Sequence, residues 1–405
     1  MDAATPSLTA VDERSGMMPS DPYLELVLQT CTVILVLTSL YSLYMFKAFP
    51  SLPKNVDSAS WPKVSIVVPV KDEEDTIALC LDSLQALDYV SKEIIVVDGG
   101  SKDGTRKILQ KYTQGVVVVE EGALPDGWIG KNWACHQGYL QAGGELLLFT
   151  DGDTKHSPDS LRRSVGYLFS SGADLVSIYP HLVMRDFGER LMMPLISFLI
   201  FIYCGGNKVN DDSSRRYMAN GQYILTRRDA YEKVGGHTAV RGKIVEDVSL
   251  AGAYKRRGSR VRVVYGLDAL ETRMYRSFRE LWGGWVKNTY AGFNFNPAKL
   301  LGGLLAIFAA FLLPFTMLAV GMLGGGEVHR LLLVYGALGS VVVLSRMAVF
   351  YQRIGGSVKY TLLTPVASTV YLLIMITSFL KVVAAGGVVW KDRKYDLAEM
   401  RRLES

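Results

Sequence analysis

Four long apolar runs constrain this chain more than any other feature of its sequence. One run covers residues 24–46, and the others cover residues 300–323, 331–351 and 361–385. A helix of about 20 apolar residues crosses the hydrocarbon core of a bilayer, so each run is long enough to span a membrane. The sequence therefore predicts one transmembrane helix before a domain at residues 60–290 and three transmembrane helices after it.

The composition agrees with a folded domain joined to a few membrane spans. Of the 405 residues 49% are hydrophobic, which is high for a soluble protein and low for a bundle of membrane helices alone. The net charge of +5 suits an anionic lipid surface or a phosphate ligand, and we expect no nucleic-acid partner. The four cysteines include no C-x-x-C pair, so neither a disulfide framework nor a zinc site is predicted.

The residues around the first run predict its orientation. Residues 1–21 are polar and contain one basic residue, Arg14, which favours a flexible tail and a retained anchor over a cleaved signal peptide. Lys47, Lys54 and Lys63 follow the anchor. Because basic residues accumulate on the cytoplasmic side, we expect a multi-pass protein of the cell membrane whose main domain faces the cytoplasm.

Apolar strands alternate with helical segments in the first half of this domain. Strands that are apolar throughout are typical of a parallel sheet covered on both faces, so we predict an α/β fold with a mostly parallel sheet that binds its ligand at the carboxyl ends of the strands. The short apolar stretch at 191–204 favours a buried or interfacial helix. Strands are predicted at 63–70, 92–100, 115–121 and 145–153, and helices at 73–87, 103–114 (capped by Asp103) and 131–142.

Three aspartates follow strands of this predicted sheet. Asp98 and Asp151 end apolar strands, and Asp153 lies two residues after Asp151. Carboxylates gathered at one sheet edge repel each other unless a cation lies among them, and a divalent ion bound to one or two carboxylates and to phosphate oxygens would serve. Taken alone, an Asp-Gly-Asp turn with solvated acids explains the pattern at least as well, because short motifs recur by chance.

Five segments in order resemble family 2 glycosyltransferases, which are nucleotide-sugar transferases with a GT-A fold. They read VSIVVPVKDEE, EIIVVDGGSKDGT, KNWACHQGYLQAGGELLLFTDGD, NGQYILTRRDAYEKVGGH and VEDVSL, and the match runs from about Lys63 to Asn288. Two positions depart from the family pattern: Asp72 stands in place of an asparagine, and Gly99 replaces a second acid. The resemblance implies that the D-x-D acids, Asp151 and Asp153, hold Mg²⁺ or Mn²⁺ against a nucleotide diphosphate.

Three further stretches narrow the resemblance. LPDGWIGKNWAC at 124–135, GWVKN at 284–288 and WKDRKY at 390–395 are similar to carotenoid-associated and hopanoid-associated glycosyltransferases, and more distantly to ceramide glucosyltransferase. This resemblance implies a nucleotide-sugar donor, expected to be a UDP-sugar, and a lipid acceptor in the membrane.

The resemblance also assigns roles to single residues. Sugar transfer requires a stabilised leaving diphosphate and a deprotonated acceptor. Asp247 follows Glu246 in the E-D motif and is expected to be the general base of an inverting transfer. Glu73 and Asp98 are expected to hydrogen-bond the uracil or ribose of the donor, and Lys131 is expected to contact a phosphate or the base edge.

These roles have plainer alternatives. Glu73 equally fits a first-turn helix acid, Lys131 a solvated lysine, and the E-D acids ion-pair partners of Arg241 or Lys243. Many membrane members of the family also carry Q-x-x-R-W after the base, whereas this chain has RSFRELWGGW at 276–285.

The segment RSFRELWGGW supplies three more candidate residues. Arg279 is expected near the diphosphate, and Trp282 or Trp285 near the acceptor. An interfacial helix with snorkelling arginines explains the same segment. In the third apolar run, at residues 331–351, Arg346 lies near the end, where it could snorkel.

Two rival functions remain open from the sequence. A processive polysaccharide synthase would need more spans and a clean Q-x-x-R-W, and a non-catalytic membrane scaffold would explain the departures at positions 72 and 99. The basic C-terminal tail at 390–405 is also ambiguous. Three crossings after a cytoplasmic domain would place this tail outside, against the charge rule, unless one of the three runs is re-entrant or interfacial.

Overall fold

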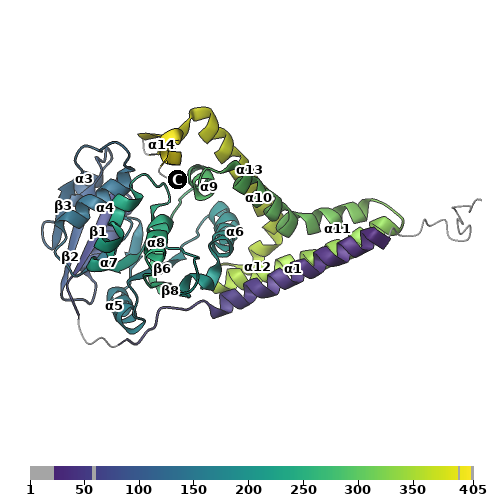
Figure 1. The fold of residues 1–405 in the computed structure, drawn as a ribbon, viewed down its shortest axis with the longest axis horizontal. Coiled ribbons are helices and arrows are strands. Elements are labelled where there is room, and N and C mark those ends of the chain that lie inside the picture. The colour runs from purple at the N-terminus through teal and green to yellow at the C-terminus, as the bar shows by residue number, and fades with distance from the viewer. Residues whose placement is uncertain (1–21, 57–60, 391–392, 403–405) are drawn as a thin grey trace, which may run out of the picture.

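The computed structural model describes residues 22–56, 61–390 and 393–402 (Figure 1). The tail predicted at residues 1–21 therefore lies outside the described residues. A mixed α/β domain occupies one end of the molecule, and a narrow arm of helices projects from the other end.

The α/β domain is built on one eight-stranded sheet with the strand order β3-β2-β1-β4-β7-β6-β8-β5. Strands β3, β2, β1 and β4 run parallel, β7 joins antiparallel to both β4 and β6, and β6 runs parallel to β8. The predicted α/β fold with a mostly parallel sheet is confirmed. The strands are β1 (Val64–Val70), β2 (Lys92–Asp98), β3 (Val116–Glu120), β4 (Leu146–Phe149), β5 (Thr154–His156), β6 (Leu175–Leu182), β7 (Ile224–Arg227) and β8 (Val261–Thr272).

The central strands carry apolar side chains on both faces because both faces of the sheet are covered. Successive side chains of a strand point to opposite faces. In β1, Ile66 and Val68 therefore pack into one hydrophobic cluster, while Val67 packs into the other. All three side chains are fully buried, which explains why this strand shows no alternation of polar and apolar residues.

Two of the helices around the sheet are shorter than the predicted ones. Helix α2 begins four residues later than predicted, because Glu73 to Thr76 form a turn in which the Thr76 N–H donates to the Glu73 carbonyl at 3.1 Å. Helix α3 has only five residues; Gly104 is its N-cap, and Asp103 accepts from the Thr105 N–H at 2.9 Å. The helices of the domain are α2 (Ile77–Gln85), α3 (Thr105–Leu109), α4 (Gly130–Gln141), α5 (Ser160–Ser170), α6 (Phe187–Cys204), α7 (Arg228–Val234), α8 (Glu246–Arg256) and α9 (Phe278–Gly292), with short turns η1 (Gly206–Asn210) and η2 (Gly236–Val240).

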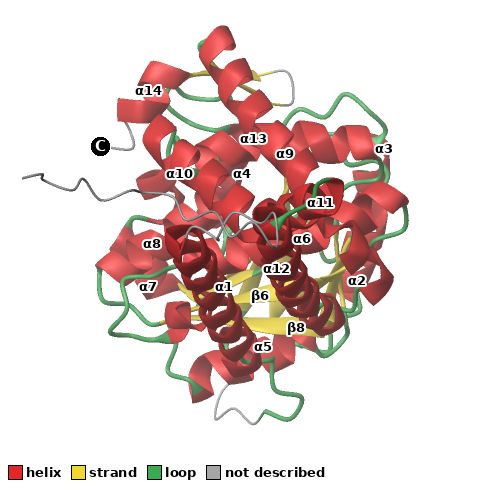
Figure 2. Ribbon diagram, turned by 90° about the vertical axis from the view of Figure 1, so that its right-hand side faces the viewer, coloured by secondary structure: helices red, strands yellow, loops and turns green. Residues whose placement is uncertain are grey.

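Five helical segments in the described part of the chain are long and apolar enough to cross a membrane. Helices α1, α11 and α12 run side by side in the projecting arm, and the chain between α10 and α11 forms a π-helical turn (Figures 1 and 2). The segments are α1 (Pro22–Ala48); α6; Pro297–Leu323, with α10 (Pro297–Ile307), η3 (Phe308–Leu312) and α11 (Leu313–Leu323); α12 (Glu327–Arg353); and Val358–Ala385, with η4 (Val358–Leu363) and α13 (Thr364–Ala385).

Arg346 of α12 does not snorkel to water, in contrast to the expectation. The side chain is 4% exposed, and its guanidinium lies 5.1 Å from the ring centre of Phe198 and 4.5 Å from that of Phe311. It also donates to the hydroxyl of Ser39 at 3.4 Å and to the carbonyl of Ala310 in the π turn at 3.3 Å. Arg346 thus ties α12 to α1, to α6 and to the π turn.

Helix α13 lies apart from the arm and leads back to the α/β domain (Figure 1). It packs against α9, where the Tyr290 N–H donates to the Ser378 hydroxyl at 3.0 Å, and it ends at Gly386, whose φ of 63° turns the chain. The stretch predicted as a basic tail then forms most of an antiparallel hairpin and a short helix. These elements are β9 (Gly387–Trp390), β10 (Arg393–Asp396) and α14 (Leu397–Arg402).

Candidate active site

A cavity of about 160 Å³ opens at the carboxyl ends of β1, β2 and β4, where the sequence predicted a ligand. Four predicted residues line it: Glu73, Lys131, Asp151 and Asp153. The other lining residues were not predicted as ligand contacts, and they include Lys71, Gly99, Glu121, Arg393 and Tyr395. Arg393 and Tyr395 come from the C-terminal hairpin. The sequence pointed to this hairpin only through the resemblance of the WKDRKY stretch.

Lys131 connects the two acidic motifs of the chain. It is the second residue of α4, and its Nζ lies 2.6 Å from Oδ1 of Asp151 and 2.7 Å from Oε1 of Glu246. Burial lowers the pKa of Lys131, but the charges of the two carboxylates outweigh burial and raise this pKa well above its ordinary value. Lys131 is therefore a permanent cation between the end of β4 and the start of α8, rather than a solvated lysine.

The carboxyl of Asp153 is buried, and one of its oxygens lacks a hydrogen-bond partner in the described structure. Burial of the carboxyl, with the charges of Asp151 and Glu73, raises the pKa of Asp153 to about 7. Its Oδ1 atom is buried and has no hydrogen-bond partner in the described structure. A buried carboxylate oxygen without a partner is costly, and a hard divalent cation would satisfy it. The residues present thus fit a divalent metal.

The protein offers only part of a coordination shell there. No group of three His, Cys, Asp or Glu side chains within the described residues is arranged to hold a metal by itself. Magnesium sites that use one or two carboxylates complete their shell with water and with phosphate oxygens of the substrate. The coordination shell of the metal would therefore be complete only when a phosphate-bearing ligand is bound.

Asp247 is held by the backbone at the start of α8. Its Oδ2 accepts from the Gly221 N–H and its Oδ1 from the Val248 N–H, both at 2.8 Å. Burial and the neighbouring charge of Glu246 raise the pKa of Asp247 to about 7 despite these bonds. A carboxyl that titrates near neutral pH in a fixed orientation is suited to general-base catalysis.

Gly221 allows this arrangement because it has no side chain. A Cβ atom at this position would lie 3.0 Å from Nζ of Lys131 and 3.5 Å from Oδ2 of Asp247. The segment NGQYILTRRDAYEKVGGH, which resembles the stretch before the catalytic acid in the family, thus brings a backbone N–H to hydrogen-bond distance of Asp247.

The turn after β1 explains one departure from the family pattern. Asp72 has a φ of +54°, a conformation that asparagine and aspartate tolerate better than most residues. Its carboxylate accepts from the Lys102 N–H at 2.7 Å. Aspartate therefore replaces asparagine without loss of the turn, which presents Glu73 to the cavity.

Asp98 lies behind the cavity wall instead of lining it. Its side chain is 2% exposed; Oδ1 accepts from the Ser101 N–H at 2.9 Å and its hydroxyl at 2.5 Å, and Oδ2 accepts from Arg106 Nε at 2.7 Å. Both oxygens are thus engaged in holding the turn between β2 and α3. The predicted contact of Asp98 with the donor is not visible in this geometry.

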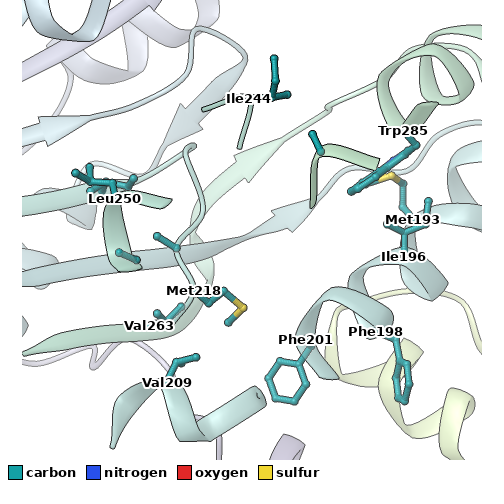
Figure 3. Packing of buried hydrophobic residues seen from close by; sticks show 14 of the residues in the cluster. Met193, Ile196, Phe198, Phe201, Val209, Met218, Ile244, Leu250, Val263 and Trp285 are labelled. Atoms are coloured by element: carbon teal, nitrogen blue, oxygen red, sulfur yellow. The ribbon is translucent and has the colours of Figure 1, made fainter. Parts of the chain in front are cut away.

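The predicted α9 residues lie outside the cavity. Arg279 is exposed, whereas Arg276 reaches the β1–α2 turn through a 2.6 Å ion pair with Asp75. Trp282 packs on Phe278, with ring centres 6.0 Å apart. Trp285 is buried beside Met193 and Ile196 of α6 (Figure 3), and its Nε1 has no hydrogen-bond partner in the described structure.

The sequence profile described as Glycosyl transferase family 2 matches residues 65–235, which contain the sheet edge, Lys131 and both D-x-D acids. This chain carries a family 2 glycosyltransferase domain. The predictions of this family and of a glycosyltransferase enzyme are thereby confirmed.

Two relatives of the glycosyltransferase extend the similarity over nearly the whole chain. A 4,4'-diaponeurosporenoate glycosyltransferase of Staphylococcus aureus strain MRSA252 is 25% identical over 387 residues, covering 91% of this chain and 97% of the relative. The protein of the same name from strain USA300 is 24% identical over 379 residues and covers the same shares.

A solved structure shares the fold. A mannosyltransferase from Pyrobaculum calidifontis in complex with GDP-Man and Mn²⁺ superposes with a TM-score of 0.53 at 19% sequence identity, over 88% of this chain and 98% of that chain. At this identity the likeness speaks for the fold, and it confirms the predicted GT-A architecture.

Proposed function

We propose that this glycosyltransferase moves a hexose from a nucleotide-diphosphate sugar to a hydroxyl or carboxyl group of a membrane lipid or isoprenoid, with inversion at the anomeric carbon. The observation that carries the proposal is the Lys131 bridge, which brings the D-x-D turn and the E-D motif to one site. The relatives named for a carotenoid acid support a long apolar acceptor, and the GDP-Man complex of the mannosyltransferase supports a nucleotide-sugar donor.

Asp153 and Asp151 would hold a divalent metal, Mg²⁺ or Mn²⁺, against the diphosphate. The partnerless Oδ1 of Asp153 supports this assignment, as does the Mn²⁺ bound to the mannosyltransferase. When bound, the ion would neutralise the charge that develops on the leaving diphosphate. Lys131 adds a second positive charge at the same edge, and Glu73, which lines the same cavity, would contact the ribose or base side of the donor.

Asp247 would accept the proton of an acceptor hydroxyl, because its carboxyl is fixed by two N–H groups and titrates near neutral pH. A carboxylic acid acceptor is already ionised at neutral pH and has no proton to give up. The need for Asp247 therefore depends on which of the two groups receives the sugar.

Two rival functions receive less support. A scaffold with a decayed domain was favoured by the departures at positions 72 and 99. However, Asp72 keeps the turn, and Glu121 places another carboxylate beside Gly99. A processive synthase is not favoured by any contact in the described structure.

The direct test of the proposed function uses the full chain in detergent or nanodiscs. UDP-sugars and GDP-sugars are supplied after chelation of metals, and release of the nucleotide is followed on addition of Mn²⁺ or Mg²⁺ with a lipid alcohol or carboxylic acid. We expect release that depends on metal and acceptor and that Asp153→Asn removes. Asp159→Asn, a nearby exposed carboxylate outside the cavity, is the matched control. Release that persists in Asp153→Asn, or no release with any donor, would refute the proposal.

We further infer that three helices cross the membrane: α1, the α10–α11 segment and α12. The C-terminal hairpin contacts the catalytic domain, so an even number of crossings must separate them. The grouping of α1, α11 and α12 in one arm supports these spans, and α6 and α13 would then lie at the membrane surface. The lysines after α1 support a cytoplasmic domain.

The side of the hairpin can be measured directly. A single cysteine is placed at exposed Lys394 in a chain that lacks the four native cysteines. We expect protection from an impermeant maleimide in intact cells and labelling after lysis. Labelling in intact cells would place the hairpin, and with it the catalytic domain, outside.

A further inference from the structure

We propose that Glu121 and Arg393 read the nucleobase of the donor, so that the C-terminal hairpin is part of the donor site and selects bases that carry an N–H beside a carbonyl. This inference rests on the proposed nucleotide-sugar donor. It concerns the end of the cavity farthest from the D-x-D acids.

The sheet order places this pair at the base end. Asp151 and Asp153 follow β4, and Glu121 follows β3, with β1 and β2 between these strands. Neighbouring strands lie about 4.8 Å apart, so the cavity runs across roughly 14 Å of sheet edge. A donor whose diphosphate lies at β4 therefore extends its ribose over β1 and its base over β2 and β3.

Glu121 occupies the space left by the missing acid of the family pattern. A Cβ atom on Gly99 would lie 3.2 Å from Oε2 of Glu121, so a longer side chain at position 99 would compete for the same volume. The Glu121 side chain is 2% exposed; Oε2 is 3.0 Å from Arg393, and Oε1 has no partner in the described structure. Glu121 also lines the cavity, and a buried acceptor without a partner on a lining side chain indicates a ligand that donates a hydrogen bond there.

Arg393 places hydrogen-bond donors beside the Glu121 carboxylate. Its guanidinium pairs with Glu121 and donates to the Gly99 carbonyl at 3.4 Å, and it also lines the cavity. Gly130 makes room for it, because a Cβ atom there would collide with the guanidinium. The hairpin is held further by the Gly130 N–H, which donates to the Tyr395 hydroxyl at 3.2 Å.

The chemistry of the pair defines the class of base. Uracil and guanine both present a ring N–H next to a carbonyl, so the carboxylate accepts from the N–H while the guanidinium donates to the carbonyl. Cytosine and adenine present a ring nitrogen that is an acceptor, and it would face the carboxylate oxygen without a proton between them. The pair therefore favours UDP-sugars and GDP-sugars over CDP-sugars and ADP-sugars.

The test measures binding of free nucleotides, separately from transfer. The full chain in nanodiscs with Mn²⁺ is titrated calorimetrically with UDP, GDP, CDP and ADP. We expect UDP or GDP to bind at least ~10-fold more tightly than CDP and ADP, the worth of one charge-assisted hydrogen bond. Arg393→Ala should weaken the preferred nucleotide by ~10-fold, and Arg393→Lys should restore only part of this loss, because lysine lacks the planar fork.

Glu121→Gln is the sharper variant, because its shape is unchanged and its amide both donates and accepts. We expect it to bring CDP or ADP within ~3-fold of the preferred nucleotide. Lys394→Ala, an exposed neighbour in β10, is the matched control and should leave every affinity unchanged. Thermal unfolding of each variant excludes misfolding as the cause of a loss.

Each outcome decides the inference. An unchanged base preference in Glu121→Gln together with an unchanged affinity in Arg393→Ala would overturn it, even if the wild-type protein transfers sugar normally. A wild-type protein that transfers sugar but binds CDP as tightly as UDP and GDP would also overturn it. A wild-type protein that binds none of the four nucleotides would instead refute the proposed function on which the inference rests.

Discussion

The two acid pairs of the site, Asp151 with Asp153 and Glu246 with Asp247, have similar electrostatics and different hydrogen bonding. In each pair one member is ion-paired with Lys131, and burial raises the pKa of the other to about 7. However, Asp247 accepts two backbone N–H bonds, whereas Oδ1 of Asp153 has no partner in the described structure. The same charge pattern thus prepares one carboxyl to take a proton and the other to take a cation.

The largest effect should come from Asp153, whose Oδ1 has no hydrogen-bond partner in the described structure. We expect Asp153→Asn to lower transfer by ~10⁴-fold, because charge stabilisation by a bound metal is worth several kcal/mol and each ~1.4 kcal/mol is tenfold in rate. Calorimetry should show that Mn²⁺ no longer strengthens nucleotide binding. A variant that keeps its metal-dependent nucleotide affinity would break the contrast between the two pairs.

The matching change in the other pair should separate rate from binding. With a hydroxyl acceptor we expect Asp247→Asn to lower kcat by ~10²–10³-fold, within the usual worth of a general base, and to leave nucleotide affinity unchanged. With a carboxylate acceptor the loss should stay below ~10-fold, since no proton has to be removed. Asp229→Asn, an exposed first-turn acid of α7, is the control. Equal losses with both acceptors would argue against Asp247 as a base.

The pH dependence of the transfer rate should report the ionisation of Asp247. Asp247 has a pKa of about 7 and acts as a base only when deprotonated, so its active fraction rises with pH through this value. At saturating donor and metal we expect the rate with a hydroxyl acceptor to fall by ~5-fold between pH 7 and pH 6 and to level off above pH 8. A rate that falls as pH rises through 7 would contradict the assignment.

The smallest effects should come from the start of α9 and the residues just before it, where Arg279 was expected near the diphosphate but does not line the cavity. We expect Arg279→Ala to change kcat/KM by less than ~2-fold, as is usual for exposed side chains away from a site. Arg276→Ala, which removes the ion pair with Asp75 beside the β1–α2 turn, should cost ~3-fold through a less ordered Glu73. A larger loss in Arg279→Ala than in Arg276→Ala would return α9 to the donor site.

The sequence predicted the parallel half of the sheet well, because its strands are apolar on both faces and each is followed by a polar turn. It could not predict that α3 would be only five residues long, since the length of a helix depends on tertiary packing as well as on propensity. Lys131 was recognised as a ligand candidate, but its role as a bridge depends on α8 lying opposite β4. Glu121 and Arg393 carried no readable motif as a pair, because they meet only through the return of the C-terminus.

The return of the C-terminal hairpin to the α/β domain has a consequence for biosynthesis. The hydrogen bond between Gly130 and Tyr395 joins residues 265 positions apart, and Arg393 reaches Glu121 across 272 positions. During translation the catalytic domain is complete long before these hairpin residues leave the ribosome. The cavity can acquire its last wall only after the hairpin has been synthesised, and the helices of the arm precede the hairpin in the chain. A chain that stops before the hairpin would therefore contain the candidate acids without the complete cavity, and with the three proposed crossings the insertion of the arm would precede full donor binding.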